Sequence, residues 1–338
     1  MKFYVSIDYS DSESKKALPS LLKFLKERKV KFSVEKKEKK GKVEELKGFD
    51  IIIAFGSSFN VLRTFRDMKT DKPVLGVSIY ENEFLPEITL EDFKRLFSRI
   101  NNGEYSIEKR NRLEAFVDDK PLPPVLNEFV VTANKSASVI SYSLYIDNKK
   151  MFKDEGDGII ISTPTGSTGY SSSSGGPIVL NDADIIELTP LSSMQQNKPM
   201  IANGNSLVTI DNLNSKSGID IVGDGRFRYP FRGKRITIRK HEQPANFITI
   251  NEIKKTPIEK MKSRDLSMPH IDDAPPSAKF ILKLLQYEGP LTQKDIINLS
   301  ALQIRTARHG ISYLKRKGLI EENKTLRDAR FSIYRLKS

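Results

Sequence analysis

An apolar strand runs directly into a loop of small and hydroxyl-bearing residues at 157–170, which reads Asp-Gly-Ile-Ile-Ile-Ser-Thr-Pro-Thr-Gly-Ser-Thr-Gly-Tyr. The β-branched run Ile159 to Ile161 is typical of a strand that is buried on both faces. Gly166 and Gly169 permit backbone conformations closed to other residues and let backbone N–H groups approach a ligand. Three hydroxyl groups that can donate to phosphate or ribose oxygens lie in the same loop: those of Thr165, Ser167 and Thr168. This combination predicts a nucleotide-binding loop held rigid by a buried strand.

The block continues into Gly175-Gly176-Pro177-Ile178, and as a whole it resembles the most diagnostic motif of the NAD kinase family. Composition alone favours a surface turn rich in serine and glycine. The ordered similarity over all of 157–170 favours the binding loop instead. The resemblance implies an α/β domain followed by a mainly β domain, with the ligand in the cleft between them.

The same resemblance implies residues that contact a bound adenine dinucleotide. Asn127 and Glu128 match a pair that contacts ribose hydroxyls and the adenine side of the site, and Asp157 matches an aspartate near the nicotinamide ribose. The other expected ligand-binding residues lie in the loop or just after it: Thr165, Thr168, Gly169, Tyr170 and Ser173. We therefore expect NAD, NADP or ADP-ribose as bound ligand, with no catalytic cofactor and no metal.

A short turn at Asp224-Gly225-Arg226 resembles an Asp-Gly-Gln turn of the family that belongs partly to a subunit interface. Glycine after aspartate is equally typical of an ordinary hairpin turn, so both interpretations stay open.

The sequence departs from the family pattern at Gly56-Ser57-Ser58-Phe59-Asn60, which stands where the family carries Gly-Gly-Asp-Gly-Thr. The resemblance places Ser58 at the position of the catalytic aspartate, which takes the proton of the attacking ribose 2′-hydroxyl. Serine cannot act as that base unaided, and Asp50 and Asp67 lie too far from the loop to replace it. Phe59 fills a glycine position and is expected to obstruct the approach of phosphates. A further family block, at 76–85, keeps only its first glycine and its final Phe-Leu.

Residues 277–338 are predicted to form a winged helix-turn-helix. Helical spacing of apolar residues predicts a helix at 277–285, Thr292 caps a short helix that ends at Leu299, and a third helix covers 302–317. Strands at 319–320 and 331–336 would flank a wing at 321–330. The inward stripe of the third helix is expected to consist of Ile304, Ala307, Ile311 and Leu314. The segment is similar to archaeal transcription regulators of the MarR-like winged-helix group.

Basic charge is concentrated in this segment. Residues 277–338 contain 13 Lys and Arg against 5 Asp and Glu, so +8 of the chain's net charge of +13 lies in less than a fifth of its length. A winged helix can also bind proteins, but this charge favours double-stranded DNA as the partner. The expected DNA contacts are Gln303, Arg305, Thr306 and Arg308 on the third helix and Lys324, Arg327 and Arg330 on the wing.

The length of 338 residues allows two or three domains. Alternating strands and helices predict an α/β domain at 1–104, and short alternating apolar segments predict a mainly β domain at 105–262. A polar, proline-bearing linker at 263–276 precedes the winged helix-turn-helix. The absence of cysteine and the presence of only 3 histidines disfavour disulfides and a zinc site. With no apolar run long enough to span a membrane, we expect a cytoplasmic protein.

Loss of the catalytic position alongside a retained dinucleotide loop predicts binding without turnover. The leading hypothesis is a DNA-binding transcription regulator that senses an adenine dinucleotide through a catalytically inactive NAD-kinase-like fold, as a homodimer or homotetramer. The alternative is an active NAD kinase that phosphorylates the NAD 2′-hydroxyl and carries a regulatory winged helix. A third hypothesis is a protein that buffers NAD(P) and uses its C-terminal module for assembly.

Overall fold

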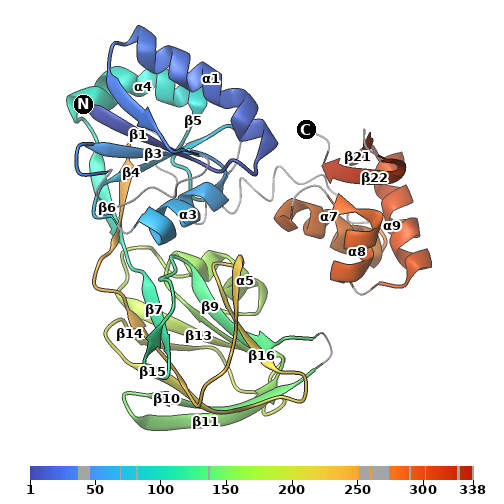
Figure 1. Cartoon of the computed structure of the whole chain (residues 1–338). Helices are drawn as coiled ribbons and strands as arrows, with labels where there is room; N and C mark the ends of the chain where they lie inside the picture. The colour runs from blue at the N-terminus through green and yellow to red at the C-terminus, as the bar shows by residue number, and fades with distance from the viewer. Residues whose placement is uncertain are drawn as a thin grey trace. The chain divides into compact units, whose positions relative to one another are not determined.

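The computed structural model describes residues 1–36, 46–68, 70–80, 83–135, 138–250, 259–260, 274–288, 291–300, 302–325 and 328–336. The chain divides into two compact units, Met1–Arg264 and Asp265–Ser338 (Figure 1). Most of the expected linker, 263–276, lies outside the described residues. Among the described residues, no helix is both long and apolar enough to cross a lipid bilayer.

The first unit opens with a seven-stranded sheet of order β2-β1-β3-β4-β19-β6, in which β5 also pairs with β4. All its pairings are parallel except that of β19 with β6. The strands are β1 Lys2–Ile7, β2 Lys31–Val34, β3 Ile51–Gly56, β4 Val74–Ser78, β5 Ile88–Thr89, β6 Ser106–Arg110 and β19 Ala245–Thr249. We call this sheet and its helices the α/β domain.

Helices cover both faces of this sheet (Figure 1). They are α1 Ser12–Glu27, α3 Ser58–Met68 and α4 Leu90–Asn102. Alternate residues of β1 point to opposite faces, so Phe3 and Val5 pack in one core with α1 and α4, whereas Tyr4 packs in another with α3. A strand covered on both faces is apolar along its whole length, which explains the run Ile51 to Phe55.

Strands β6 and β19 belong to this sheet although both lie in the range 105–262 that the sequence assigns to the second domain. The reason lies in β19, whose neighbouring residues Phe247 and Ile248 are buried in the cores on opposite faces of the sheet. The α/β domain therefore takes its last two strands from the two ends of the β-rich segment.

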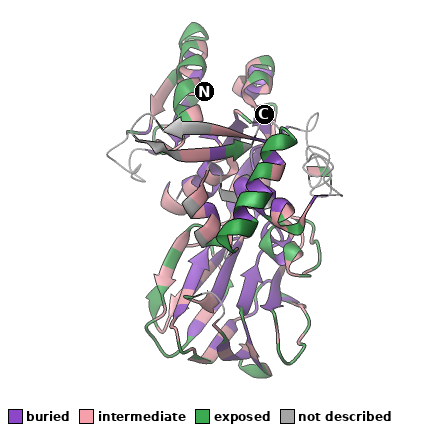
Figure 2. Ribbon diagram, turned by 90° about the vertical axis from the view of Figure 1, so that its right-hand side faces the viewer, coloured by how far each residue is buried: buried purple, intermediate pink, exposed green. Residues whose placement is uncertain are grey.

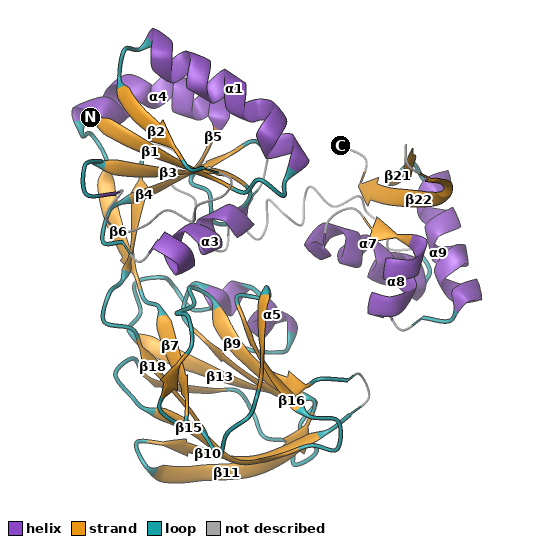
Figure 3. Ribbon diagram, in the orientation of Figure 1, coloured by secondary structure: helices purple, strands orange, loops and turns teal. Residues whose placement is uncertain are grey.

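The β-rich segment forms two six-stranded antiparallel sheets, of order β11-β10-β15-β18-β7-β8 and β14-β13-β12-β9-β16-β17 (Figure 3). A shared apolar core includes Phe129, Tyr142, Ile159 and Ile238, and buried residues dominate these strands in Figure 2. We call this the β domain. Its strands are β7 Leu113–Val117, β8 Lys120–Pro121, β9 Glu128–Ala133, β10 Ile140–Ile146, β11 Lys149–Gly156, β12 Gly158–Ser162, β13 Ile185–Leu191, β14 Met200–Asn203, β15 Val208–Asn214, β16 Ile219–Gly223, β17 Phe227–Pro230 and β18 Ile236–Lys240. A 3-10 turn, Gly166–Thr168, and helix α5, Tyr170–Ser173, follow β12.

The described residues of the second unit form three helices and a small antiparallel sheet of order β20-β22-β21. Its elements are α7 Pro276–Glu288, β20 Leu291–Thr292, α8 Gln293–Ser300, α9 Ile304–Arg316, β21 Ile320–Thr325 and β22 Asp328–Leu336. Ala307, Ile311 and Leu314 are buried as expected, but Ile304, in the first turn of α9, is 56% exposed and lies outside the core of this unit. The strands also extend through most of the expected wing, 321–330, because their ladder continues to the pair Thr325 and Asp328.

Thr292 and Asp295 form a reciprocal cap at the start of α8. The Thr292 hydroxyl accepts the Asp295 N–H at 3.2 Å, and the Asp295 carboxylate accepts the Thr292 N–H at 3.0 Å. We expect Thr292→Ala to destabilise the second unit by about 1 kcal/mol, which lowers its melting temperature by roughly 4–8 °C. Thermal unfolding of the full chain measures this, with Thr292→Ser as the control that keeps the cap. Equal shifts in both variants would show that the hydroxyl cap is not the cause.

Candidate nucleotide site

Two glycines fix the path of the loop after β12. Gly158 has φ +154°, and a Cβ there would lie closer than 3.0 Å to the Val131 carbonyl oxygen of the neighbouring strand. A Cβ on Gly166 would come as close to three backbone atoms of Asn127. The loop therefore packs directly against the backbone at 126–128, and only glycine allows this contact.

Thr163 joins the loop to that backbone. Its hydroxyl donates to the Leu126 carbonyl at 2.6 Å, and its N–H donates to the Asn127 carbonyl at 2.9 Å. The Gly166 N–H donates in turn to the Thr163 hydroxyl at 3.1 Å. The segment 126–128 is thereby held from one side by the glycine-rich loop.

The turn between β16 and β17 holds the segment from the other side. Asp224 and Gly225 have φ 48° and 64°, as the central residues of a mirror-image turn do, and the Arg226 N–H closes the turn on the Gly223 carbonyl at 3.0 Å. The Asp224 carboxylate accepts the N–H groups of Leu126 at 3.1 Å and Asn127 at 2.8 Å. The turn is thus an ordinary hairpin whose buried aspartate also positions Asn127 and Glu128. The sequence analysis did not place Asp224 in the site.

Two buried carboxyl groups meet here. Burial and, as a smaller contribution, the charge of Asp224 raise the pKa of Glu128 to about 8. Burial also raises the pKa of Asp224 to about 6, against the two N–H groups that favour its charged form. Near neutral pH Glu128 is therefore mostly protonated, and a neutral carboxylic acid both donates and accepts hydrogen bonds.

Asn127 presents an unused acceptor. Its Oδ1 atom is buried and has no hydrogen-bond partner within the described part of the chain. A buried acceptor without a partner costs free energy, roughly 1–3 kcal/mol, unless a ligand or water supplies the donor. Asn127 and Glu128 together offer polar atoms suited to the hydroxyl groups of a nucleotide.

The structure brings Asp157 and Tyr170 to the same region. Burial raises the pKa of Tyr170, and the charges of Asp157 and Glu128 raise it further. The Tyr170 side chain remains 49% exposed, and Asp157 is exposed with its carboxylate accepting the Ser192 hydroxyl at 2.6 Å. A Cβ on Gly169 would lie 4.0 Å from Glu128 Oε2, so this residue also borders the pair.

The remaining expected residues bond mainly within their own loop. Thr165 is 4% exposed, and its hydroxyl donates to Asn181 Oδ1 at 3.5 Å. The Thr168 hydroxyl donates to the Thr165 carbonyl and the Ser173 hydroxyl to the Gly169 carbonyl, each at 3.3 Å. Thr165 and Ser173 therefore stabilise the loop in this structure, a role that the ligand-based interpretation did not include.

Sequence reasoning also missed Glu187, which is fully buried in β13. Its carboxylate accepts the hydroxyls of Ser171 at 2.7 Å and Ser162 at 3.0 Å, and Gly176 leaves room for it. Glu187 thus ties α5 to the sheet beneath the loop. A charged residue inside the apolar run Ile185 to Leu188 was the available signal.

A second polar group lies at the carboxyl ends of the parallel strands. Ser58 begins α3, and both its N–H, at 2.8 Å, and its hydroxyl donate to Glu83 Oε2. The Ser58 oxygen accepts the N–H groups of Phe84 and Leu85, each at 3.2 Å. A carboxylate therefore lies beside Ser58, although the sequence analysis considered only Asp50 and Asp67. Asp50 accepts the Lys2 N–H at the opposite end of the sheet, and Asp67 pairs with Arg66.

A contact of Phe59 with Arg226 connects the loop at Ser58 and Glu83 with the turn that supports Asn127 and Glu128. The guanidinium of Arg226 lies 4.4 Å from the centre of the Phe59 ring, and that of Arg66 lies 5.4 Å from the Phe227 ring. The loop at Ser58 thus adjoins the hairpin turn that supports Asn127 and Glu128. The contact of Phe59 with Arg226 places a cation at this edge. The expected obstruction of phosphates by Phe59 stays a prediction.

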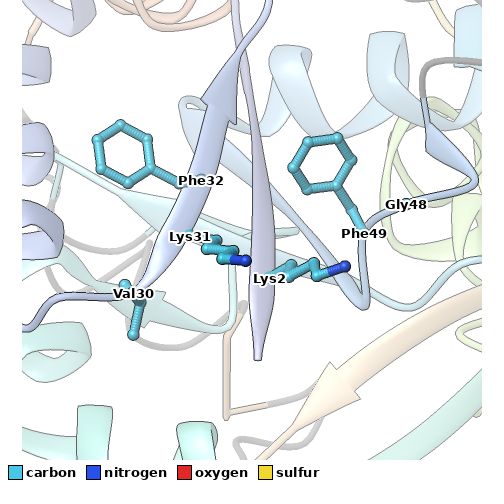
Figure 4. Close-up of a pocket in the computed structure, with 6 residues that line it drawn as sticks. All are labelled: Lys2, Val30, Lys31, Phe32, Gly48 and Phe49. Atoms are coloured by element: carbon cyan, nitrogen blue, oxygen red, sulfur yellow. The ribbon is translucent and has the colours of Figure 1, made fainter.

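Two other features carry less weight. A hollow at the amino ends of β1 and β2 lies at the opposite end of the sheet from Ser58 (Figure 4); it is lined by Lys2, Val30, Lys31, Phe32, Gly48 and Phe49. Ligands in such sheets bind beyond the carboxyl ends of the strands instead. Among the described residues, no group of three or more His, Cys, Asp or Glu side chains could hold a metal ion.

Comparison with known proteins decides the family. Residues 5–105 match the model of the ATP-NAD kinase N-terminal domain, and residues 126–250 match that of the ATP-NAD kinase C-terminal domain. The NAD kinase of Clostridium botulinum (strain Loch Maree / Type A3) is 33% identical over 214 residues, which cover 62% of this chain and 76% of that protein. The chain belongs to the NAD kinase family. The NAD kinase of Thermococcus kodakarensis is 32% identical over 219 residues, covering 64% of this chain and 79% of that protein.

Solved structures of NAD and NADH kinases share the fold. The crystal structure of an NAD kinase from Archaeoglobus fulgidus in complex with ATP has a TM-score of 0.61 at 24% identity, covering 73% of this chain and 93% of that chain. Yeast NADH kinase complexed with NADH has a TM-score of 0.64 at 19% identity, covering 78% and 85%. Both expected domains of the NAD kinase fold are therefore present.

These comparisons contradict the leading hypothesis of the sequence analysis. The relatives named NAD kinase align with this chain over most of their own length. They support an enzyme and not a catalytically inactive, DNA-binding transcription regulator. The inactive interpretation was wrong in treating Ser58 in isolation, because the carboxylate beside it comes from a loop 25 residues further along the chain.

The same comparisons contradict the prediction of double-stranded DNA as a partner. Exposed residues of α9 and its N-cap were assigned to it, namely Gln303, Arg305, Thr306 and Arg308. Of the expected wing residues, Lys324 lies in β21 and Arg330 in β22, whereas Arg327 falls outside the described residues. The homodimer or homotetramer was not tested.

Proposed function

We propose that this chain is an active NAD kinase, which transfers the γ-phosphoryl group of ATP to the 2′-hydroxyl of NAD. The observation that carries the proposal is the contact of Arg226 with Phe59, because it joins the turn beneath Asn127 and Glu128 to the edge at Ser58. A phosphoryl-transfer enzyme needs an acceptor site and a donor site side by side, since its catalysis is mainly positioning and charge stabilisation.

On the acceptor side, we assign the ribose hydroxyls of the dinucleotide to Asn127 and Glu128. The unpaired Asn127 Oδ1 accepts from a hydroxyl, and the protonated Glu128 both donates and accepts. We also assign Asp157, Thr168, Gly169 and Tyr170 to this side, because Asp157, Gly169 and Tyr170 border the same region. Thr165 and Ser173 keep the loop in shape. We call Asn127, Glu128 and the residues that border them the dinucleotide cradle. NAD, NADP and ADP-ribose share the adenosine half that this cradle would bind.

On the donor side, we assign the phosphates of ATP to the carboxyl ends of β1, β3 and β4. The N-terminus of α3 at Ser58 favours negative charge, and Arg226 adds a cation beside it. ATP enters as its magnesium complex, so the metal arrives with the substrate.

We infer that the second unit is a winged helix. Its order of helix, short strand, two helices and a two-stranded hairpin matches that architecture, with β20 completing the sheet beside β22. We assign it as a regulatory module of the kinase, consistent with its core being separate from the kinase cores.

The test is direct turnover by the purified full chain. With NAD and magnesium ATP, we expect NADP and ADP to form in equal amounts, measured by enzymatic cycling of NADP. The control replaces NAD by NADP, whose 2′ position is already occupied, and should consume no ATP. Absence of 2′-phosphorylated product from both NAD and NADH would overturn the proposal.

A further inference from the structure

We propose that Glu83 is the general base of the reaction and takes the proton of the NAD 2′-hydroxyl. This inference rests on the proposed function, since it names the proton acceptor for that phosphoryl transfer. A hydroxyl nucleophile needs a base within hydrogen-bond reach as the new bond to phosphorus forms.

The chain holds Glu83 at the edge of the sheet by returning after β4. The Glu87 N–H donates to the Gly76 carbonyl at 3.1 Å, and the lack of a side chain on Gly76 lets Pro86 pack against it. Leu85 is 3% exposed, and β5 then pairs with β4. Glu83 is therefore fixed by buried neighbours on its C-terminal side.

Ser58 positions the carboxylate. Its oxygen accepts the N–H groups of Phe84 and Leu85, and its own N–H and hydroxyl both donate to Glu83 Oε2. Both contacts use the same carboxylate oxygen, so within the described residues Oε1 is left for a substrate. Ser58 is thus a positioning residue.

Two other carboxylates at this edge, those of Asp8 and Asp11, are committed to local structure. Asp8 accepts the Ser10 N–H at 2.8 Å and the Ser10 hydroxyl at 2.7 Å, which closes a turn. Asp11 caps α1 by accepting the Glu13 N–H at 3.1 Å and also accepts the Tyr80 hydroxyl at 3.2 Å. Glu83 is the carboxylate that contacts the start of α3, where it accepts the Ser58 N–H one residue before Phe59.

The reaction transfers one phosphoryl group and releases one proton. The 2′-oxygen of NAD forms a bond to the γ-phosphorus of ATP, and the bond from that phosphorus to the β,γ-bridging oxygen breaks. ADP leaves with the electron pair of the broken bond. The proton of the 2′-hydroxyl passes to Glu83 Oε1 and from there to water, so the products are NADP, ADP and a proton.

The test compares turnover of the full-length wild type with that of Glu83→Gln. The amide still accepts the Ser58 N–H but is no base, so we expect kcat to fall about 100-fold or more, with KM for NAD changed less than about threefold. The matched control is Glu13→Gln, a glutamate of α1 that pairs with Lys16 at 2.8 Å and should keep kcat. Ser58→Asp combined with Glu83→Gln should recover at least a tenth of wild-type kcat, because it restores a carboxylate.

Wild-type kcat in Glu83→Gln would overturn the role of Glu83 while leaving the kinase proposal standing. No NADP from the wild type would overturn both. If Glu83→Gln fails to bind NAD, the double variant Ser58→Asp with Glu83→Gln decides. Recovered turnover in the double variant supports the role of Glu83 as base. A double variant that binds NAD but shows no turnover contradicts that role.

Discussion

Replacing Gly158 with alanine is expected to destabilise the first unit by roughly 3 kcal/mol or more, and to weaken NAD binding with it. The residue starts β12, the strand between β9 and β13, and its φ of +154° is rarely adopted by L-residues. The added Cβ would also press on the Val131 carbonyl, a backbone atom that cannot move without shifting β9. Because β9 begins at Glu128, the strain reaches the dinucleotide cradle directly.

Chemical denaturation followed by far-ultraviolet circular dichroism measures this effect. Gly175→Ala is the matched control, since Gly175 has φ +90° but nothing within 4 Å of an added Cβ. It carries the conformational cost alone, about 1 kcal/mol. If the two variants lose equal stability, the close approach to β9 is not the constraint that we infer.

Substituting Glu128 with glutamine is expected to remove most of the pH dependence of the first unit's stability between about pH 4 and 8. In the folded protein, burial holds the pKa of Glu128 at about 8 and that of Asp224 at about 6, above their ordinary values of 4.5 and 3.8. The folded state therefore keeps protons that the unfolded chain releases. Stability is complete below the ordinary values and falls as pH rises toward the raised ones.

Glutamine resembles the protonated glutamate and carries no such penalty. We expect Glu128→Gln to match the wild type near pH 4 and to exceed it by roughly 4 kcal/mol near pH 8. Denaturation at several pH values tests this, with Glu27→Gln as a control at an exposed carboxylate of α1. A parallel pH profile in wild type and Glu128→Gln would show that Glu128 is already ionised when buried.

Some of the site could be read from the sequence because its signal is local. The run Ile159 to Ile161 and the glycine at 166 specify a buried strand and a tight loop within a few residues, and the structure has both. The position of Thr292 three residues before Asp295 likewise predicted the cap of α8, which the structure contains. Such features depend on neighbours that are close in the chain.

The rest depends on contacts between distant residues. Asp224 reaches Leu126 across 98 positions, and Glu83 reaches Ser58 across 25, so no window of the sequence displays either pair. The contact of Phe59 with Arg226 likewise joins residues that lie far apart in the sequence. The wrong prediction of an inactive regulator arose in the same way, because a missing carboxylate was judged from its own loop alone.

The insertion of the β domain between β6 and β19 also sets an order of events during synthesis. Arg110 pairs with Ala245, so the chain leaves the parallel sheet and re-enters it at adjoining positions after more than a hundred residues. β4 has β19 as its neighbour, and that edge stays open until residues 245–249 have left the ribosome. A sheet whose first strand begins at Lys2 is thus completed by β19, the last strand among the described residues of the first unit. The unpaired edge of β4 must remain out of reach of other chains until then.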